Sequence, residues 1–247
     1  MSGGVHSVAT AIELLECFAQ DEELGVSEIA RHLGVAKSTA HRMLTTLVAG
    51  GLIETGLEPG RYRLGMRLYE LGQLAVARNH IRAVALPTLV ELRRRSGLTV
   101  QLAVPDGTDV VYAERLETNL GVGLLRRTGT RLPAHTTSSG KAIAAFNPAF
   151  ADRIRAGGFP RRTSLSLRSR TAWDQVLADT RRQYGAISHD EATIGVGSCA
   201  APMFGPAGEA IAAVSLVGPT SAFTERGEQF LKLVKVAAAA LSRTPVV

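Results

Sequence analysis

The chain has 247 residues, of which 45% are hydrophobic and 20% charged, and its net charge is +6. This is the composition of a globular protein with one large or two small domains, and it excludes a collagen-like, coiled-coil or wholly disordered chain. No stretch of about 18 uncharged apolar residues indicates a membrane span, and the first ten residues lack a signal peptide pattern, so we expect a cytoplasmic protein without a membrane partner.

Three short helices are predicted in the first fifty residues. Apolar residues recur at helical spacing in three stretches: residues 8–19, 27–33 and 38–49. Ser7 and Ser27 are the expected N-caps of the first two helices. Gly34 supplies the left-handed residue of a tight turn between the second and the third helix. Two helices joined in this way predict a helix-turn-helix.

The outward face of the third helix carries residue types that suit the major groove of DNA. Up to residue 65 the chain has 5 Lys and Arg against 8 Asp and Glu, yet residues 31–42 hold three cations and no acid. Arginine can bond a guanine edge through two hydrogen bonds, and Thr or Ser can reach bases or phosphates. A solvated charged face is the alternative. The residues of this helix predicted to contact DNA are Lys37, Ser38, Thr39, His41, Arg42 and Thr46.

A β-hairpin is predicted directly after this helix. Residues 52–54 and 61–64 alternate like strands, and Glu58-Pro59-Gly60 marks the turn between them. We expect Arg61 and Arg63, on the returning strand, to lie against the phosphate backbone, with two solvated arginines as the alternative. Residues 1–65 thus predict a winged helix-turn-helix domain that binds double-stranded operator DNA.

These motifs resemble those of a known family. The run VAKSTAHRML at residues 35–44, followed by GRYRLG at residues 60–65, is similar to the winged helix of the IclR family of bacterial transcriptional regulators, and the resemblance continues to about Leu241. It implies that residues 66–79, predicted as one helix with an apolar stripe, form a linker helix that takes part in dimerisation. Spacing alone leaves that stripe open between domain core and a helix–helix contact.

Residues 80–247 are expected to form a second domain, of the α+β class with an antiparallel sheet. Helices are predicted over residues 82–95, 139–146, 149–156, 173–183 and 224–241, and strands over residues 99–105, 109–115, 120–127, 186–188, 198–204 and 210–217. We expect Pro87 to interrupt the first of these helices and Thr224 to cap the last. The resemblance implies that this is a GAF-like effector-binding domain.

The resemblance also implies a small-molecule pocket in this domain, for small carboxylates, aromatic acids or related metabolites. Hydroxyl groups beside the unpaired N–H groups of a helix start form a ready carboxylate site, and apolar walls complete such pockets. Without the resemblance, the same serines are interpreted as helix caps and satisfied strand hydroxyls. The residues predicted to bind the effector are Leu132, Ser138, Ser139, Ser188, Val196, Ser198, Ser215 and Val217.

Two departures from the family pattern concern the ligand. Ser198 stands where the family usually has a cysteine, and Cys199 follows it. Ser188 and His189 stand where the family often has two acids. Loss of an acid removes a repulsion from a carboxylate ligand, and a protonated His189 can pair with an anion, the alternative being an exposed loop histidine.

No catalytic motif is complete. Residues 138–141 lack the first glycine and the final Ser or Thr of a phosphate-binding loop, because His135 and Ala142 stand at those positions. A Gly-x-Ser-x-Gly elbow is absent. The 2 cysteines and 6 histidines show neither a disulfide framework nor metal-ligand spacing. We therefore expect no enzymatic activity, no metal and no cofactor.

The resulting prediction is a ligand-responsive transcriptional regulator of a catabolic or metabolic operon, acting as a homodimer or homotetramer. The resemblance to the family favours repression over activation. Two alternatives stay open: a constitutive dimeric DNA-binding protein without ligand control, and a small-molecule enzyme with a vestigial winged helix. The effector and the operator are not named by the sequence.

Overall fold

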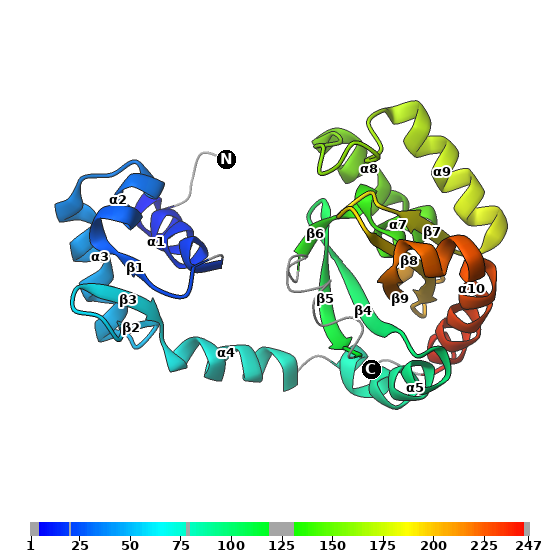
Figure 1. Cartoon of the computed structure of the whole chain (residues 1–247), viewed down its shortest axis with the longest axis horizontal. Helices are drawn as coiled ribbons and strands as arrows, with labels where there is room; N and C mark the ends of the chain where they lie inside the picture. The colour runs from blue at the N-terminus through cyan, green and yellow to red at the C-terminus, as the bar shows by residue number, and fades with distance from the viewer. Residues whose placement is uncertain (1–4, 20, 78–79, 119–130, 245–247) are drawn as a thin grey trace. The chain divides into compact units, whose positions relative to one another are not determined.

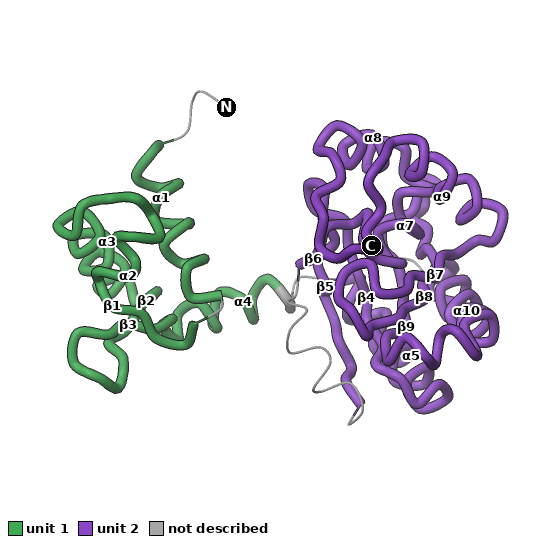
Figure 2. The backbone as a smooth tube through the Cα atoms, turned by 45° about the horizontal axis from the view of Figure 1, so that its top comes forward, with its two compact units in different colours: residues 1–78 green, residues 79–247 purple. Residues whose placement is uncertain are grey.

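The computed structural model describes residues 5–19, 21–77, 80–118 and 131–244. The chain groups into two compact units, residues 1–78 and residues 79–247 (Figure 2). Among the described residues, unit 1 holds one buried apolar cluster and unit 2 holds two.

Unit 1 begins with three helices around a small apolar core. The helices are α1 (His6–Glu16), α2 (Val26–Leu33) and α3 (Lys37–Ala49), with a 3₁₀ turn, η1 (Cys17–Ala19), after α1. Each contributes to the core, which includes Leu14, Phe18, Ile29 and Leu44. Ile29 and Leu44 are inward positions of the predicted helical patterns. The pattern predicted for the first helix is wrong in part, because Val8 and Ile12 are exposed and Leu14 is buried in their place.

A glycine turn joins α2 to α3. Gly34 has φ +64°, a left-handed conformation that strongly favours glycine. The Val35 N–H donates to the Ala30 carbonyl at 3.0 Å, which closes the end of α2. The predicted helix-turn-helix is confirmed.

A three-stranded antiparallel sheet completes the winged domain. Its strands are β1 (Leu24–Gly25), β2 (Ile53–Thr55) and β3 (Arg61–Leu64), in the order β1-β3-β2. Strands β2 and β3 form the predicted hairpin, with Glu54 opposite Arg63. The short strand β1 was not predicted, because two residues are too few for a period-two pattern.

Two predicted helix caps in unit 1 are wrong. Ser7 lies inside α1, because the Val5 carbonyl already accepts hydrogen bonds from Val8 and Ala9. Ser27 lies inside α2, whose N-cap is Gly25. The Gly25 N–H donates to the carboxylate of Glu28 at 2.7 Å, so an acid of the first turn replaces the expected serine.

Helix α4 (Met66–Ala77) ends the described part of unit 1. Its large side chains are exposed: Met66, Tyr69, Leu71 and Leu74. The apolar stripe of this helix is therefore not part of the core of unit 1.

Unit 2 is built on a six-stranded antiparallel sheet in the order β6-β5-β4-β9-β8-β7. The strands are β4 (Thr99–Asp106), β5 (Asp109–Leu116), β6 (Arg131–Pro133), β7 (Ala186–His189), β8 (Val196–Phe204) and β9 (Ala210–Pro219). Strand β6 was not predicted, and the predicted strand 120–127 lies outside the described residues.

Helices cover both faces of this sheet (Figure 1). One face packs against α5 (His80–Ser96) and α10 (Thr220–Ser242). The other packs against α7 (Ser138–Ala145), α8 (Pro148–Gly157) and α9 (Arg170–Gln183). A 3₁₀ turn, η2 (Ala134–Thr136), leads into α7. The predicted α+β class is confirmed for both units.

Two helix predictions in unit 2 are corrected. Helix α5 runs through Pro87 without a break. Helix α10 begins at Thr220, four residues before the predicted cap. The Thr224 hydroxyl donates to the carbonyl of Thr220 at 3.2 Å, which is a bond within a helix and not an N-cap bond.

Candidate functional site

The first candidate site is the outer face of α3. Ala40 and Leu44 are fully buried, which turns the opposite side of the helix to solvent. Six residues predicted to contact DNA lie on that exposed side: Lys37, Ser38, Thr39, His41, Arg42 and Thr46. The helix therefore presents a polar, cationic surface on unit 1.

The two cations of this face are available for a partner. Within the described residues, no carboxylate forms an ion pair with Lys37 or Arg42. The Thr46 hydroxyl donates to the carbonyl of Arg42 at 3.0 Å and keeps its acceptor lone pairs. An uncompensated Arg and Lys beside hydroxyl groups suit phosphates and base edges.

Unlike Lys37 and Arg42, the two arginines of the wing have acidic partners within unit 1. Arg61 donates to the carbonyl of Glu23 at 3.0 Å and lies 3.4 Å from the carboxylate of Glu28. Arg63 pairs with Glu54 across the hairpin at 2.7 Å. Arg63 thus joins β3 to β2, and Arg61 joins β3 to α2 and to the residue before β1. The sequence reasoning did not anticipate these roles within unit 1.

The second candidate site is a small cavity in unit 2, called here the unit 2 pocket. It has a volume of about 30 Å³ and opens on the sheet face that α7 covers. Its lining residues are Gln101, Tyr112, Leu132, Thr136, Thr137, Ser188, Ala192, Val196, Ser198 and Val217. Hydroxyl and amide groups combine here with apolar walls, which is the usual make-up of a small-molecule site.

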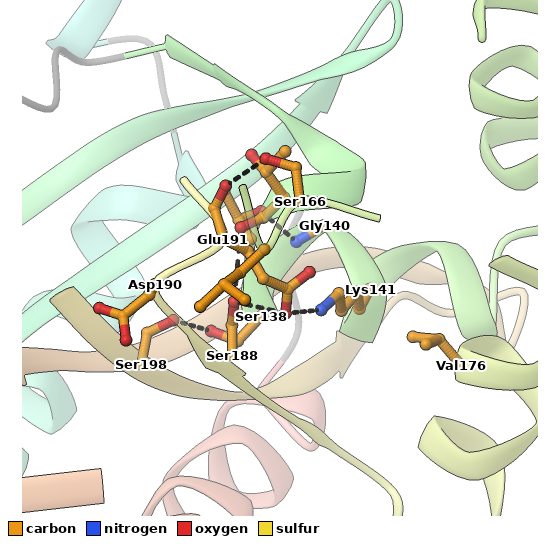
Figure 3. Close-up of polar contacts among 12 residues, drawn as sticks. Ser138, Gly140, Lys141, Ser166, Val176, Ser188, Asp190, Glu191 and Ser198 are labelled. Atoms are coloured by element: carbon orange, nitrogen blue, oxygen red, sulfur yellow. Dashed lines mark hydrogen bonds and ion pairs between the residues drawn. The ribbon is translucent and has the colours of Figure 1, made fainter. Parts of the chain in front are cut away.

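A pair of serines joins α7 to β8 at this pocket. The Ser138 hydroxyl donates to the Ser198 hydroxyl at 2.8 Å (Figure 3). The N-cap of α7 is neither predicted serine but Thr137, whose hydroxyl accepts from the Gly140 N–H at 2.9 Å. Ser138 is therefore free of a capping role and is turned toward the strand.

A buried ion pair lies beside the serines (Figure 3). The ammonium of Lys141 on α7 contacts the carboxylate of Glu191, and their side chains are 4% and 15% exposed. Burial lowers the pKa of Lys141, and the neighbouring carboxylate opposes that shift. Glu191 also accepts from the Ser188 hydroxyl at 2.9 Å, which links the pair to the pocket wall.

Hydrogen bonds hold both Glu191 and its neighbour Asp190 in place. The Thr163 hydroxyl donates to the carbonyl of Asp190 at 2.7 Å, and the Ser166 hydroxyl donates to that of Glu191 at 2.7 Å. The carboxylate of Asp190, a residue with φ +58°, accepts from Thr220 at 2.6 Å. Since Thr220 begins α10, this segment connects the pocket wall to the last helix.

The structure brings most of the predicted effector residues together. Five of the eight line the unit 2 pocket: Leu132, Ser188, Val196, Ser198 and Val217. Ser138 reaches it through Ser198, and Ser139 is buried at the start of α7. The hydroxyl of Ser215 is buried without a hydrogen-bond partner among the described residues. His189 is exposed and does not line the pocket.

Sequence reasoning missed five lining residues: Gln101, Tyr112, Thr136, Thr137 and Ala192. Gln101 carried a usable signal, because a glutamine in the middle of an apolar strand needs a polar neighbour. Tyr112 is partly buried, and desolvation raises the pKa of its hydroxyl to about 12. Its hydroxyl is therefore a neutral donor at any physiological pH.

The described residues offer no metal site. No group of His, Cys, Asp and Glu in these ranges is arranged to hold an ion. Nor is any helix within them both long and apolar enough to cross a membrane.

Comparisons with known proteins assign both units. Residues 7–56 match the IclR helix-turn-helix domain, and residues 73–243 match the C-terminal part of bacterial transcriptional regulator IclR. The transcriptional regulator XynR of Escherichia coli K12 is 37% identical over 243 residues, which cover 97% of this chain and 96% of that protein. The transcriptional repressor IclR of the same strain is 28% identical, over 91% of this chain and 84% of that protein.

A solved structure is also similar along its whole length. It is an IclR homolog from Microbacterium hydrocarbonoxydans complexed with 4-hydroxybenzoate, with a TM-score of 0.80 and 30% identity over 96% of this chain and 97% of that one. The matched family and these relatives are regulators, so the expectation of a regulator and not an enzyme is confirmed. This chain belongs to the IclR family of bacterial transcriptional regulators.

Proposed function

We propose that this regulator is a repressor of a catabolic or metabolic operon and that a small organic acid or aromatic acid derivative controls it in the cytoplasm. One observation carries the proposal: the same chain has an uncompensated cationic recognition helix and, in another unit, a pocket lined by hydroxyl and amide groups. Two relatives support it, since one is named a repressor and another was solved with 4-hydroxybenzoate.

At the DNA, α3 enters the major groove. Arg42 reads a base edge, and its neighbours contact bases or phosphates: Lys37, Ser38, Thr39, His41 and Thr46. Arg61 and Arg63 keep the wing in place through their ion pairs, so their contribution to phosphate contacts is smaller than that of Lys37.

The active form is a homodimer, or a tetramer made of two dimers. The support is α4, where Met66, Tyr69, Leu71 and Leu74 expose apolar surface that a second copy of the helix would cover. A dimer meets two half-sites at a fixed spacing, so a small change in the placement of its DNA-binding units changes affinity strongly.

The effector acts from the unit 2 pocket. A ligand bonded to Ser188 and Ser198 competes with the bonds that these residues make to Glu191 and Ser138. The adjoining Asp190 fastens the start of α10, so the ligand biases the position of that helix. A coupling free energy of about 1–3 kcal/mol between the two sites gives a 5- to 150-fold response.

The test is fluorescence anisotropy with the DNA upstream of the gene and its neighbours, at fixed salt, with and without small aliphatic and aromatic acids. Specific binding that one compound shifts supports the proposal. Specific binding that is indifferent to every compound favours a constitutive DNA-binding protein. No specific binding, even at low salt, refutes the proposal.

A further inference from the structure

Arginine is concentrated between two of the helices of unit 2. Residues 153–173, from the end of α8 to the start of α9 (Figure 1), contain six arginines and no Asp or Glu. Arg155 is neutralised, because it pairs with the carboxylates of Asp152 and Asp174. Among the described residues, no carboxylate forms an ion pair with any of the other five: Arg153, Arg161, Arg162, Arg168 and Arg170.

Residues 161–168, called here the arginine loop, have a backbone that two buried hydroxyl groups hold in place. The Ser166 hydroxyl accepts from the N–H groups of Arg162 at 3.1 Å and of Thr163 at 2.9 Å. The hydroxyls of Thr163 and Ser166 in turn donate to the carbonyls of residues 190 and 191, each at 2.7 Å (Figure 3). The three arginines of the loop are exposed. The loop thus presents its cations to solvent on a backbone that does not depend on their charges.

Each guanidinium of the arginine loop has donors to spare. Arg161 donates from Nε to the carbonyl of Thr163 at 3.0 Å, and Arg168 donates from Nη2 to the carbonyl of Ser164 at 3.4 Å. Arg162 also donates to one backbone carbonyl, at 3.4 Å. A guanidinium has five N–H donors, so most of those on each arginine are available to a partner. Since Thr163 and Ser164 are adjacent, Arg161 and Arg168 are held at the same part of the loop.

Helix α9 adds positive potential beside the loop. Its N-cap, Ser169, directly follows Arg168, and Arg170 is its first residue. The Ser169 hydroxyl accepts from the Ala172 N–H at 3.1 Å, and the first turn contains no acidic residue. The N-terminus of a helix of 14 residues carries a partial positive charge. The loop and the start of the helix therefore form one cationic surface.

We propose that the arginine loop is a second DNA-binding surface, which contacts the phosphate backbone beside the base pairs that α3 reads. This inference rests on the proposed function, because it takes operator DNA as the partner. Arginine suits phosphate, since its planar fork donates two parallel hydrogen bonds to the phosphate oxygens. Such contacts carry no sequence information, so the loop contributes affinity and α3 contributes specificity.

Charge and exposure favour DNA over other anions. The arginines of the loop do not line the unit 2 pocket, and exposed guanidinium groups along a loop fit an extended polyanion better than a small enclosed acid. An acidic protein segment would need an apolar centre beside the charges, and Leu165 is the only exposed large hydrophobic residue of the loop. Duplex DNA carries one negative charge per about 1.7 Å of its axis, and α3 brings it to this protein.

The experiment measures how DNA affinity depends on salt. The full-length wild type and the combined variant Arg161→Gln, Arg162→Gln, Arg168→Gln are titrated by anisotropy with two duplexes from upstream of the gene. One has about 25 bp, enough for two half-sites one helical turn apart, and the other has about 60 bp and includes the flanks.

Each phosphate contact contributes about 0.9 to the slope of log affinity against log salt. For two or three lost contacts, we expect the slope on the long duplex to fall by about 1.8 to 2.7 in the glutamine variant. Between 50 and 200 mM salt the wild type then loses about 10- to 40-fold more affinity for the long duplex than the variant does. The slope on the short duplex stays unchanged.

Further variants separate the loop from general effects. Arg161→Lys, Arg162→Lys and Arg168→Lys combined keep the charge and most of the slope, which a purely structural role of the arginines would not allow. Arg168→Gln alone lowers the slope by about 0.9 and answers the question if the combined variant does not fold. The matched control removes the same charge on the α10 side of the sheet and leaves the slope unchanged: Lys232→Gln, Lys235→Gln and Arg243→Gln combined.

Four results overturn the inference. The slope on the long duplex is unchanged in the glutamine variant, the control lowers it equally, or the short duplex shows the same loss. The fourth is that labelled poly-glutamate binds the wild type but not the glutamine variant while both bind the long duplex equally, which makes the partner an acidic protein segment.

The proposed function fails separately, if the wild type does not prefer these duplexes to a non-specific duplex of the same length. The loop is then tested on the long non-specific duplex, because phosphate contacts do not depend on sequence. A slope that falls there in the glutamine variant supports the assignment of the loop, and an unchanged slope overturns it.

Discussion

Replacement of Glu191 by glutamine tests whether the buried ion pair of unit 2 is essential to its stability. The substitution keeps the size of the side chain and its ability to accept from Ser188 but removes the negative charge beside Lys141. The Lys141 side chain is only 4% exposed. Removal of one partner of a buried pair leaves an uncompensated charge, so we expect a loss of about 3–5 kcal/mol in the free energy of unfolding at pH 7.

The loss depends on pH with a definite sign. Burial lowers the pKa of Lys141 in the folded state below its ordinary value, so between the folded and the unfolded pKa the unfolded chain binds more protons. Stability therefore rises with pH across that window. Glu191→Gln removes the carboxylate that opposes the shift, which extends the window to lower pH. The variant then regains stability with rising pH by at most about 1.4 kcal/mol per unit, while the wild type changes less over the same range.

The free energies of unfolding of the wild type and of Glu191→Gln are measured by urea denaturation between pH 7 and 9.5, with tryptophan fluorescence as the signal. Trp173 is the only tryptophan of the chain and is fully buried in the core that α7 shares, so its signal reports on unit 2. Glu209→Gln, at an exposed carboxylate of the same unit, is the matched control. Lys141→Met combined with Glu191→Gln removes both charges and recovers most of the loss. A loss below about 1 kcal/mol, or a pH profile parallel to that of the wild type, refutes the reasoning.

Three more predictions concern other parts of the chain. Arg42→Ala should cost about 1–3 kcal/mol of DNA affinity at one operator position, measured by anisotropy with base-substituted operators; an equal loss on every sequence makes Arg42 a phosphate contact. Arg61→Ala should lower the thermal stability of unit 1 and leave the salt dependence of DNA binding unchanged, because its guanidinium is held by internal partners; a slope reduced by about 0.9 restores the phosphate contact expected from the sequence. Gly140→Ala should destabilise unit 2 by about 2 kcal/mol or more in urea, since a Cβ there overlaps the carbonyl of Ala134; wild-type stability contradicts this close approach.

The helix-turn-helix was predictable because its signals are local. Ile29, Ala40 and Leu44 recur at helical spacing, and Gly34 stands where the chain needs a left-handed residue. The caps were not predictable in the same way. A serine near a helix start competes with backbone carbonyls and nearby acids, and at the start of α2 it is Glu28 that satisfies the Gly25 N–H.

The pocket serines were found through the resemblance to a family, because their burial depends on distant strands. Ser138 and Ser198 are sixty positions apart in the sequence, and only the packing of α7 on β8 brings their hydroxyls to 2.8 Å. The same holds for Lys141 and Glu191, which sequence reasoning did not connect. A long-range contact of this kind follows from the order of strands in the sheet, and no local pattern carries that information.

Arg115 shows why the alternation of side chains along a strand does not predict which face of the sheet each residue of β5 occupies. Strict alternation puts residues 112 and 115 on opposite faces of the sheet. In the structure they share a face, and the guanidinium carbon of Arg115 is 5.4 Å from the centre of the Tyr112 ring. One inserted residue, Ala113, reverses that assignment for every position after it on β5. Bulges are common next to binding sites because they redirect a single side chain without rebuilding the sheet.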